Sequence, residues 1–230
     1  MFDGSFRTNF EKVVSPIGST LNRVGVSPDL ITALGVAMAA GCAVAIGTGN
    51  FRVAFLLLVL TGLPDALDGA VAKAGGTSGP RGAYFDSVSD RLSDGLMFAG
   101  AGWYLAGGGG GYDPRMALLP FGLYIAASLV SYQRAKAESL GFDARGGLME
   151  RAERFVVLGL GLLFNEFFVP VLWLMLALTA ATAAFRFVKV WKQASVGRPM
   201  PARSPSAARR RQARAARRSR RSPVRSRRQP

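Results

Sequence analysis

Five aspartates gather within residues 64–95 of a 230-residue chain, at Asp65, Asp68, Asp86, Asp90 and Asp94. The first two are three residues apart and the next two are four apart, so on helices each pair projects from one face. A glycine-rich segment lies between the two pairs and indicates that the chain reverses there. Four of the carboxylates, Asp65, Asp68, Asp86 and Asp90, could therefore converge across a helical hairpin.

Four carboxylates in one place indicate a site for hard divalent cations. Clustered anions raise one another's pKa values unless cations compensate, and oxygen ligands select Mg²⁺, Mn²⁺ or Ca²⁺ over soft metals. Two such ions could polarise a phosphoryl group and stabilise a leaving phosphate. Spacing alone leaves three interpretations open: metal-assisted phosphoryl chemistry, an ion or proton path across a membrane, and ordinary salt bridges to Lys73, Arg81 and Arg91.

The apolar residues come in blocks that are typical of membrane helices. Three uncharged blocks lie at residues 30–49, 116–133 and 167–185. Each is close to the roughly 20 residues that cross a bilayer core. Three shorter apolar runs, which need their polar flanks to complete a span, lie at residues 53–63, 95–107 and 155–164. We predict an all-α integral membrane protein with six transmembrane helices.

Basic residues predict the orientation of these helices. Lysine and arginine concentrate in residues 1–28, 73–82 and 134–154 and in the C-terminal tail, which the positive-inside rule places in the cytoplasm. We therefore expect a multi-pass protein of the cell membrane with both termini and all five aspartates on the cytoplasmic side. The run Gly107–Gly111 is then a flexible linker on the outer side.

The two ends of the chain differ from the middle, residues 29–192, which we expect to form the membrane domain. Residues 1–28 carry apolar side chains at three- and four-residue spacing, which predicts an amphipathic helix that lies in the membrane interface or packs against the protein. Residues 193–230 hold 13 arginines and no acidic residue, as in a disordered tail. We favour attraction to anionic membrane lipid over nucleic-acid binding, and expect no nucleic-acid partner.

Histidine is absent and cysteine occurs once, as Cys42. The first fact excludes catalytic triads with histidine, histidine bases and histidine metal ligands. The second excludes an intrachain disulfide, and Cys42 reads as a small buried side chain of an apolar helix. Acid–base chemistry must then come from carboxylates, lysine, tyrosine or this cysteine.

Residues 65–90 resemble the signature of the CDP-alcohol phosphotransferases, D-x-x-D-G-x-x-A-R-x8-G-x-x-x-D-x-x-x-D. The first four aspartates match it, and so do Gly69, Ala72 and Gly82. Lys73 departs, because the family has arginine there; lysine keeps the charge but loses the planar fork of a guanidinium group. The expected family architecture has six spans and a cytosolic active site, in agreement with the topology above.

The resemblance implies that a CDP-linked lipid, CDP-diacylglycerol, donates its phosphatidyl group to an alcohol while CMP leaves. Two Mg²⁺ or Mn²⁺ ions would be held by Asp65, Asp68, Asp86 and Asp90, and Asp90 would also be the general base. The CDP-lipid would contact Asp68, Gly69, Ala72, Lys73 and Gly82. Asp94 lies outside the motif, and we expect it to support the cluster or form a salt bridge. The family commonly forms homodimers, so a homodimer is expected.

The segment 131–154 bears on the acceptor alcohol. Its S-Y-x-[KR]-A-[KR]-A-E and G-G-x-x-E-R-x-E-R patterns resemble those of the actinobacterial phosphatidylinositol phosphate synthases within that family. The resemblance implies inositol 3-phosphate as the acceptor, with its phosphate bound by Ser131, Arg134, Lys136, Arg154 and Arg186. Generic cytoplasmic positive charge is the alternative for these basic residues. Glycerol 3-phosphate is an alternative acceptor, and a cation or proton transporter is an alternative function, although we find no internal repeat.

Overall fold

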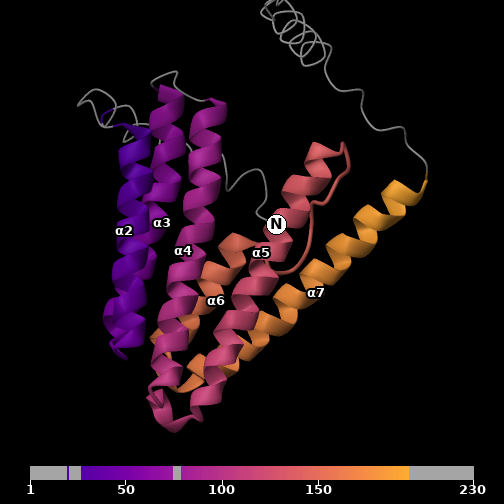
Figure 1. The fold of residues 1–230 in the computed structure, drawn as a ribbon. Coiled ribbons are helices and arrows are strands. Elements are labelled where there is room, and N and C mark those ends of the chain that lie inside the picture. Colours follow the sequence, from indigo (N-terminus) through magenta and orange to yellow (C-terminus); the bar gives the residue numbers. More distant parts are fainter. Residues whose placement is uncertain (1–19, 21–26, 75–78, 197–230) are drawn as a thin grey trace, which may run out of the picture.

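The computed structural model of the chain describes residues 20, 27–74 and 79–196, without the side chains of 63–74 (Figure 1). Within these ranges the chain forms six α-helices and three short 3₁₀ helices, and no strand. The predicted all-α class is confirmed. The amphipathic helix predicted within residues 1–28 and the tail after residue 196 lie outside the described residues.

The first three helices are α2 (Pro28–Gly47), α3 (Phe51–Ala74) and α4 (Pro80–Ala106), and α2 packs against both others. Helix α2 starts where Ser27 accepts a hydrogen bond from the Leu30 amide at 3.2 Å, with proline in the first helical position. Helices α2 and α4 approach closely, because a Cβ atom on Gly100 would lie 2.3 Å from the carbonyl oxygen of Ala43. Small residues at such a crossing let two membrane helices pack backbone to backbone.

The second half of the bundle consists of α5 (Leu118–Ser139), α6 (Arg151–Leu163) and α7 (Phe168–Ser195). Helix α5 packs along α7 and against α4, and α6 contacts α3 and α7. The short 3₁₀ helices are η1 (Gly109–Gly111) and η2 (Pro114–Ala117) between α4 and α5, and η3 (Asn165–Phe167) before α7. The longer loop of residues 140–150 connects α5 to α6 at the other end of the bundle (Figure 1).

Three helical segments are long and apolar enough to cross a membrane: Pro28–Gly47, Pro114–Ser139 and Asn165–Ser195. They contain the uncharged blocks 116–133 and 167–185 and all but the last two residues of 30–49, whose prediction as spans is thereby supported. The three shorter runs also fall in helices, α3, α4 and α6. Among the described residues, the apolar part of α3 is only Phe51–Gly62, α4 is long enough but not apolar enough, and α6 has 13 residues. Six crossings therefore remain a prediction.

The two ends of the bundle differ in chemistry. At the end where α3 and α7 begin, Phe51 packs edge-on against Tyr104 with ring centroids 4.9 Å apart, and Phe168 completes the aromatic contact at 4.8 Å from Phe51. At the other end α4 begins, and there the carboxylates and arginines gather. The apolar end holds the helices together, so the functional site must be sought at the polar end.

Candidate active site

Helix α4 carries three of the five aspartates. Asp86, Asp90 and Asp94 are spaced four residues apart and so lie along one stripe of this helix. The helix starts at Pro80, directly after Gly79, because proline suits the first helical position. Asp86 and Asp90 are partly buried, whereas Asp94, one turn deeper, is only 4% exposed.

The other half of the predicted cluster lies on α3, which continues to Ala74 and so keeps Asp65 and Asp68 in a helix. Their side chains, and those of residues 69, 72 and 73, lie outside the described part of the chain. Gly82, in the first turn of α4, has no described atom within 4 Å of an added Cβ. Among the side chains that are described, no three ligand-type residues form a metal-binding group. Convergence of the four carboxylates remains a prediction.

Two arginines at the start of α6 pair with two aspartates of α4. Arg151 Nη1 lies 2.7 Å from Asp90 Oδ1, and Arg154 Nη2 donates a hydrogen bond of 2.6 Å to Asp94 Oδ2. Arg151 Nε also lies 3.8 Å from Asp94 Oδ1. These four residues form what we name the α4–α6 ladder. The prediction that Asp94 forms a salt bridge is confirmed.

The inner rung of the ladder is almost fully buried. Arg154 is 2% exposed, and it also donates to the carbonyl oxygen of Met149 at 3.4 Å. A buried charge needs a partner of opposite charge, because an unpaired buried ion lowers the stability of the fold by roughly several kcal/mol. Asp94 and Arg154 therefore hold α4 and α6 together. Arg154 was predicted to bind the acceptor phosphate, and its guanidinium group already binds Asp94.

A pocket of about 530 Å³ opens beside the ladder, between α4, α5, α6 and α7. Among its lining residues are Asp90, Ser131, Arg134, Arg151, Arg154 and Arg186. It thus joins the last aspartate of the motif to four of the five residues predicted for the acceptor. The fifth, Lys136, is exposed on α5 and is not among the lining residues.

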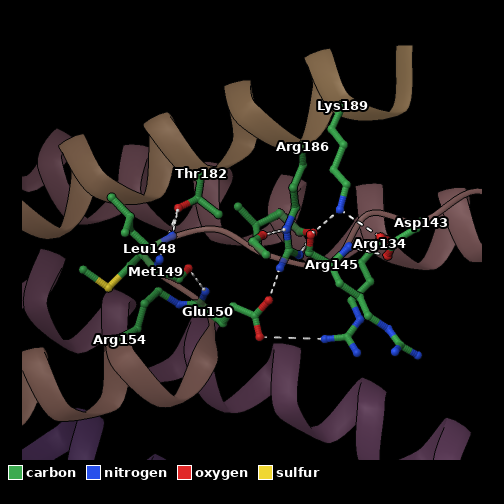
Figure 2. Close-up of polar contacts among 12 residues, drawn as sticks. Arg134, Asp143, Arg145, Leu148, Met149, Glu150, Arg154, Thr182, Arg186 and Lys189 are labelled. Carbon is green, nitrogen blue, oxygen red and sulfur yellow. Dashed lines mark hydrogen bonds and ion pairs between the residues drawn. The ribbon is translucent and has the colours of Figure 1, made fainter. Parts of the chain in front are cut away.

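Arg186 of α7 enters the pocket wall with its guanidinium group fully engaged (Figure 2). It donates hydrogen bonds of 2.9 Å to the carbonyl oxygens of Gly146 and Val130 and pairs with Glu150. An arginine within an apolar helix needs an anionic partner. Glu150 is that partner, so Arg186 ties α7 to the start of α6.

Three of the arginines that line the pocket keep part of their side chains exposed, Arg134 most, then Arg91 and Arg151. The Arg134 side chain is 44% exposed; its Nε donates to Glu138 at 3.2 Å, and its Nη1 lies 3.9 Å from Glu150. The Arg151 side chain is 21% exposed and its guanidinium group stacks over the ring of Phe155. Forked hydrogen bonds from arginine suit a phosphate dianion. Arg134 and Arg151, together with Arg91, therefore have exposed surface that an anion in this pocket could contact.

The loop of residues 140–150 is fixed to the last turns of α7. Lys189 Nζ donates to Asp143 Oδ2 at 2.9 Å and to the carbonyl oxygen of Arg145 at 2.7 Å. Gln193 binds both backbone groups of Asp143, at 3.0 and 2.6 Å. The hydrogen bond from Lys189, with that from the Arg145 amide, lowers the pKa of the Asp143 carboxyl below its ordinary value.

Sequence reasoning missed the parts played by Arg151 and Glu150. Arg151 was counted only among the basic residues of its segment, and Glu150 had no role. Both belong to the G-G-x-x-E-R-x-E-R pattern, which was the available signal. Their partners, Asp90 and Arg186, lie on helices far away in the sequence, so only the crossing of the helices identifies them.

The comparison with protein families supports the resemblance that the motif carries. Residues 25–185 match the family described as CDP-alcohol phosphatidyltransferase. The chain is 36% identical over 160 residues to a phosphatidylinositol phosphate synthase of Mycobacteroides abscessus, covering 69% of this chain and 72% of that protein.

Solved structures agree with the fold. The chain superposes on the crystal structure of Mycobacterium tuberculosis phosphatidylinositol phosphate synthase with CDP-DAG bound, with a TM-score of 0.72 and 28% identity over 78% of this chain and 94% of that one. A crystal structure of the same enzyme in complex with manganese and citrate gives a TM-score of 0.71 and 29% identity, over 77% and 88% of the two chains.

Proposed function

The chain belongs to the CDP-alcohol phosphatidyltransferase family, and we propose that it transfers the phosphatidyl group of CDP-diacylglycerol to inositol 3-phosphate. The products are CMP and phosphatidylinositol phosphate. The observation that carries this proposal is the pocket that Asp90 of the motif lines together with Arg134 and Arg151. The mycobacterial relative named phosphatidylinositol phosphate synthase supports the choice of acceptor.

The described part of the motif fits a divalent metal. Asp86 and Asp90 offer carboxylate oxygens on one face of α4, and such donors suit Mg²⁺ or Mn²⁺. A related enzyme has been crystallised with manganese. In the proposal, two ions are held by Asp65, Asp68, Asp86 and Asp90. When bound, they neutralise charge on the phosphoryl oxygens and on the departing phosphate of CMP.

Asp90 is the proposed general base. It takes the proton from the attacking hydroxyl group of the acceptor, which requires that hydroxyl to lie within hydrogen-bond reach of its carboxylate. Asp90 lines the pocket and is held by Arg151 at 2.7 Å, which fixes the direction of the carboxylate. The acceptor would therefore enter with its hydroxyl group toward α4.

The acceptor phosphate is proposed to lie against Arg134 and Arg151, with Ser131 as a further hydrogen-bonding group of the pocket wall. Arg154 and Arg186 line the same pocket, but their described hydrogen bonds go to the protein. In the proposal, these two arginines contribute positive charge to the pocket and form part of its wall, and they do not bind the acceptor phosphate through paired hydrogen bonds. The CDP-lipid would bind on the α3 side, along Asp68, Gly69, Ala72, Lys73 and Gly82.

The pocket lies at the polar end of the bundle, which we propose to be cytoplasmic, as are both termini. Inositol 3-phosphate is soluble in water, whereas CDP-diacylglycerol stays in the bilayer with its nucleotide at the surface. A site at this end lets the two substrates meet without moving a phosphate into hydrocarbon. A homodimer and contact with membrane lipids remain parts of the proposal.

The test is an acceptor panel with the purified full-length protein. CMP release would be measured with CDP-diacylglycerol and Mg²⁺ or Mn²⁺, in the presence of inositol 3-phosphate, glycerol 3-phosphate or free inositol. Release is expected with inositol 3-phosphate, and it should stop when EDTA removes the metal and return when metal is added in excess. Asp90→Asn should lower kcat by about 10²- to 10⁴-fold.

Asp113→Asn is the matched control, because Asp113 is exposed in the loop at the opposite end and only caps η2. It should retain wild-type turnover. Release with glycerol 3-phosphate alone would reassign the protein as a phosphatidylglycerophosphate synthase. Absence of release with every acceptor, from protein that is folded and metal-loaded, would overturn the proposal; ion flux lost in Asp90→Asn would then favour the transporter.

A further inference from the structure

Thr182 of α7 is a buried residue for which the sequence analysis predicted no role. It is 2% exposed. Its hydroxyl oxygen accepts hydrogen bonds from the backbone amides of Leu148 and Met149, both at 3.2 Å (Figure 2). The hydroxyl group donates one of 2.8 Å to the carbonyl oxygen of Leu178. Buried backbone amides need acceptors, so one hydroxyl group serves two residues of the α5–α6 loop.

The loop is shaped to reach this hydroxyl group. Gly146 and Gly147 have φ angles of +99° and +129°, which residues with a side chain rarely adopt. A Cβ atom on Gly147 would also lie 2.3 Å from Cγ2 of Thr182. The backbone therefore passes α7 at a distance that only glycine permits. The contact depends on both partners, the threonine on the helix and the glycine in the loop.

Leu148 and Met149, which Thr182 binds, directly precede the pocket-lining residues Glu150 and Arg151. Met149 is 1% exposed, and its carbonyl oxygen accepts the hydrogen bond from Arg154. The next residue, Glu150, pairs with Arg186, and Arg151 after it pairs with Asp90. A shift of the Leu148–Met149 backbone would therefore move both arginines at the start of α6.

We propose that Thr182 is a positioning residue for the acceptor half of the site. Its hydroxyl group fixes the chain where α6 begins, and thereby sets where Arg151 and Arg154 stand relative to α4. The inference rests on the proposed function in one respect, namely that these arginines face the acceptor. Thr182 itself does not line the pocket.

The chain offers a matched control one turn away on the same helix. Thr179 is 0% exposed, and its hydroxyl oxygen has no hydrogen-bond partner in the part of the chain that the structure describes. Thr179→Val and Thr182→Val make the same chemical change in equally buried places. Only the second removes hydrogen bonds to the loop. Thr182→Ser keeps the hydroxyl group and removes the methyl group.

Steady-state CMP release by these three variants tests the proposal. Thr182→Val should raise the KM for the anionic acceptor by about 5- to 10-fold and leave the KM for CDP-diacylglycerol within about twofold of wild type, because a misplaced binding group weakens one substrate only. Thr182→Ser should restore the acceptor KM, and Thr179→Val should not change it. An unchanged acceptor KM in Thr182→Val, or an equal rise for both substrates, would overturn the inference.

Amide hydrogen exchange without substrates separates this inference from the proposed function. Peptides that cover residues 146–151 should exchange faster in Thr182→Val than in wild type or Thr179→Val, because two amides lose their acceptor. Unchanged exchange would overturn the positioning role even in an active enzyme. If the wild type instead uses glycerol 3-phosphate, the proposed acceptor is wrong, and the same selective rise in KM is expected for that substrate.

Discussion

Two salt bridges at the polar end of the bundle each join an aspartate to a basic side chain, and they differ most in their surroundings. The inner one, between Asp94 and Arg154, has side chains that are 5% and 2% exposed. The outer one, between Asp143 and Lys189, has side chains that are 57% and 31% exposed. Their lengths are similar, 2.6 and 2.9 Å. Burial therefore decides how much each pair contributes to stability. Solvent screens the charges of the outer pair, whereas each buried charge of the inner pair needs the other to offset its loss of hydration.

The same contrast divides the arginines of the pocket. Arg154 and Arg186 are buried, and their guanidinium groups donate hydrogen bonds to Asp94, Glu150 and backbone carbonyl oxygens. Arg134 and Arg151 keep part of their surface open to the pocket. A count of basic residues in this segment cannot make the distinction. The two buried arginines only join helices, whereas Arg134 and Arg151 also pair with carboxylates but keep surface that the proposed anionic substrate could contact.

The largest effect is expected from removing one side of the inner pair. Arg154→Met leaves the buried Asp94 carboxylate with only the longer contact to Arg151 at 3.8 Å, and should lower the free energy of unfolding by about 3–5 kcal/mol. Thermal unfolding of the purified protein in detergent measures this loss. Acceptor turnover should fall as well, because α6 then loses its tie to α4.

The double variant Asp94→Leu with Arg154→Met is its control. Replacing both charges by apolar groups of similar size should recover most of the stability, since no uncompensated ion remains. Turnover should stay low. If the single variant is as stable as the wild type, the inner pair does not hold the helices together, and the contrast between the two salt bridges fails.

A smaller effect is expected at the exposed arginine of the pocket. Arg134→Ala should raise the KM for the acceptor by about 10- to 100-fold, the range for losing a hydrogen bond to a charged group. The free energy of unfolding should hardly change, because the pair of Arg134 with Glu138 is exposed to solvent and the contact with Glu150 is 3.9 Å long. Acceptor titrations in the CMP-release assay measure the shift.

Lys136→Ala is the matched comparison for Arg134→Ala. Lys136 lies two residues further along α5, is exposed, and does not line the pocket. It should keep a wild-type acceptor KM. An equal rise in both variants would show that the acceptor lies nearer the open surface of α5 than the pocket suggests, and would favour the original inclusion of Lys136 in the acceptor site.

The smallest effect is expected at the outer pair, and it should depend on pH. The pKa of Asp143 is lowered in the folded protein, mainly by the hydrogen bond from Lys189. The ionised Asp143 carboxylate therefore contributes its full stabilisation above pH 3.8, the ordinary pKa of the group. That stabilisation is lost as the pH falls through the lower pKa that Asp143 has in the folded protein. Asp143→Asn should be slightly less stable than the wild type at neutral pH.

Unfolding curves of both proteins between neutral and acidic pH check this sign. The difference in stability should stay constant down to about the ordinary pKa of an aspartate and shrink below it. Lys189→Met should show the same pattern. A difference that grows as the pH falls would contradict the lowered pKa of Asp143 and the sign of the linkage.

The sequence predicted the helices well, because hydrophobic blocks and helical spacing are local properties. The three long uncharged blocks lie in helices of spanning length, and the shorter runs fall in α3, α4 and α6. The α4 aspartates share one stripe because four-residue spacing alone requires it. The motif that identifies the family is equally local, since its positions are counted along 26 residues.

The acceptor site was predicted only as a set of residue types. Sequence reasoning named Ser131, Arg134, Arg154 and Arg186, and all four line one pocket. It did not separate the buried arginines from the exposed ones, and it included Lys136, which lies outside the pocket. Whether an arginine meets a carboxylate, a carbonyl group or solvent depends on which helices cross, and the chain does not encode that in any short segment.

By itself, therefore, the sequence determined the class of chemistry, the helices that carry it and the family to which the chain belongs. The tertiary structure decided which charges face each other: Asp94 with Arg154, Asp90 with Arg151, and Arg186 with Glu150. It also gave Thr182 its two amide partners across 33 and 34 residues of chain. The physical reason is that spacing sets the face of a helix, whereas packing between helices sets what that face meets.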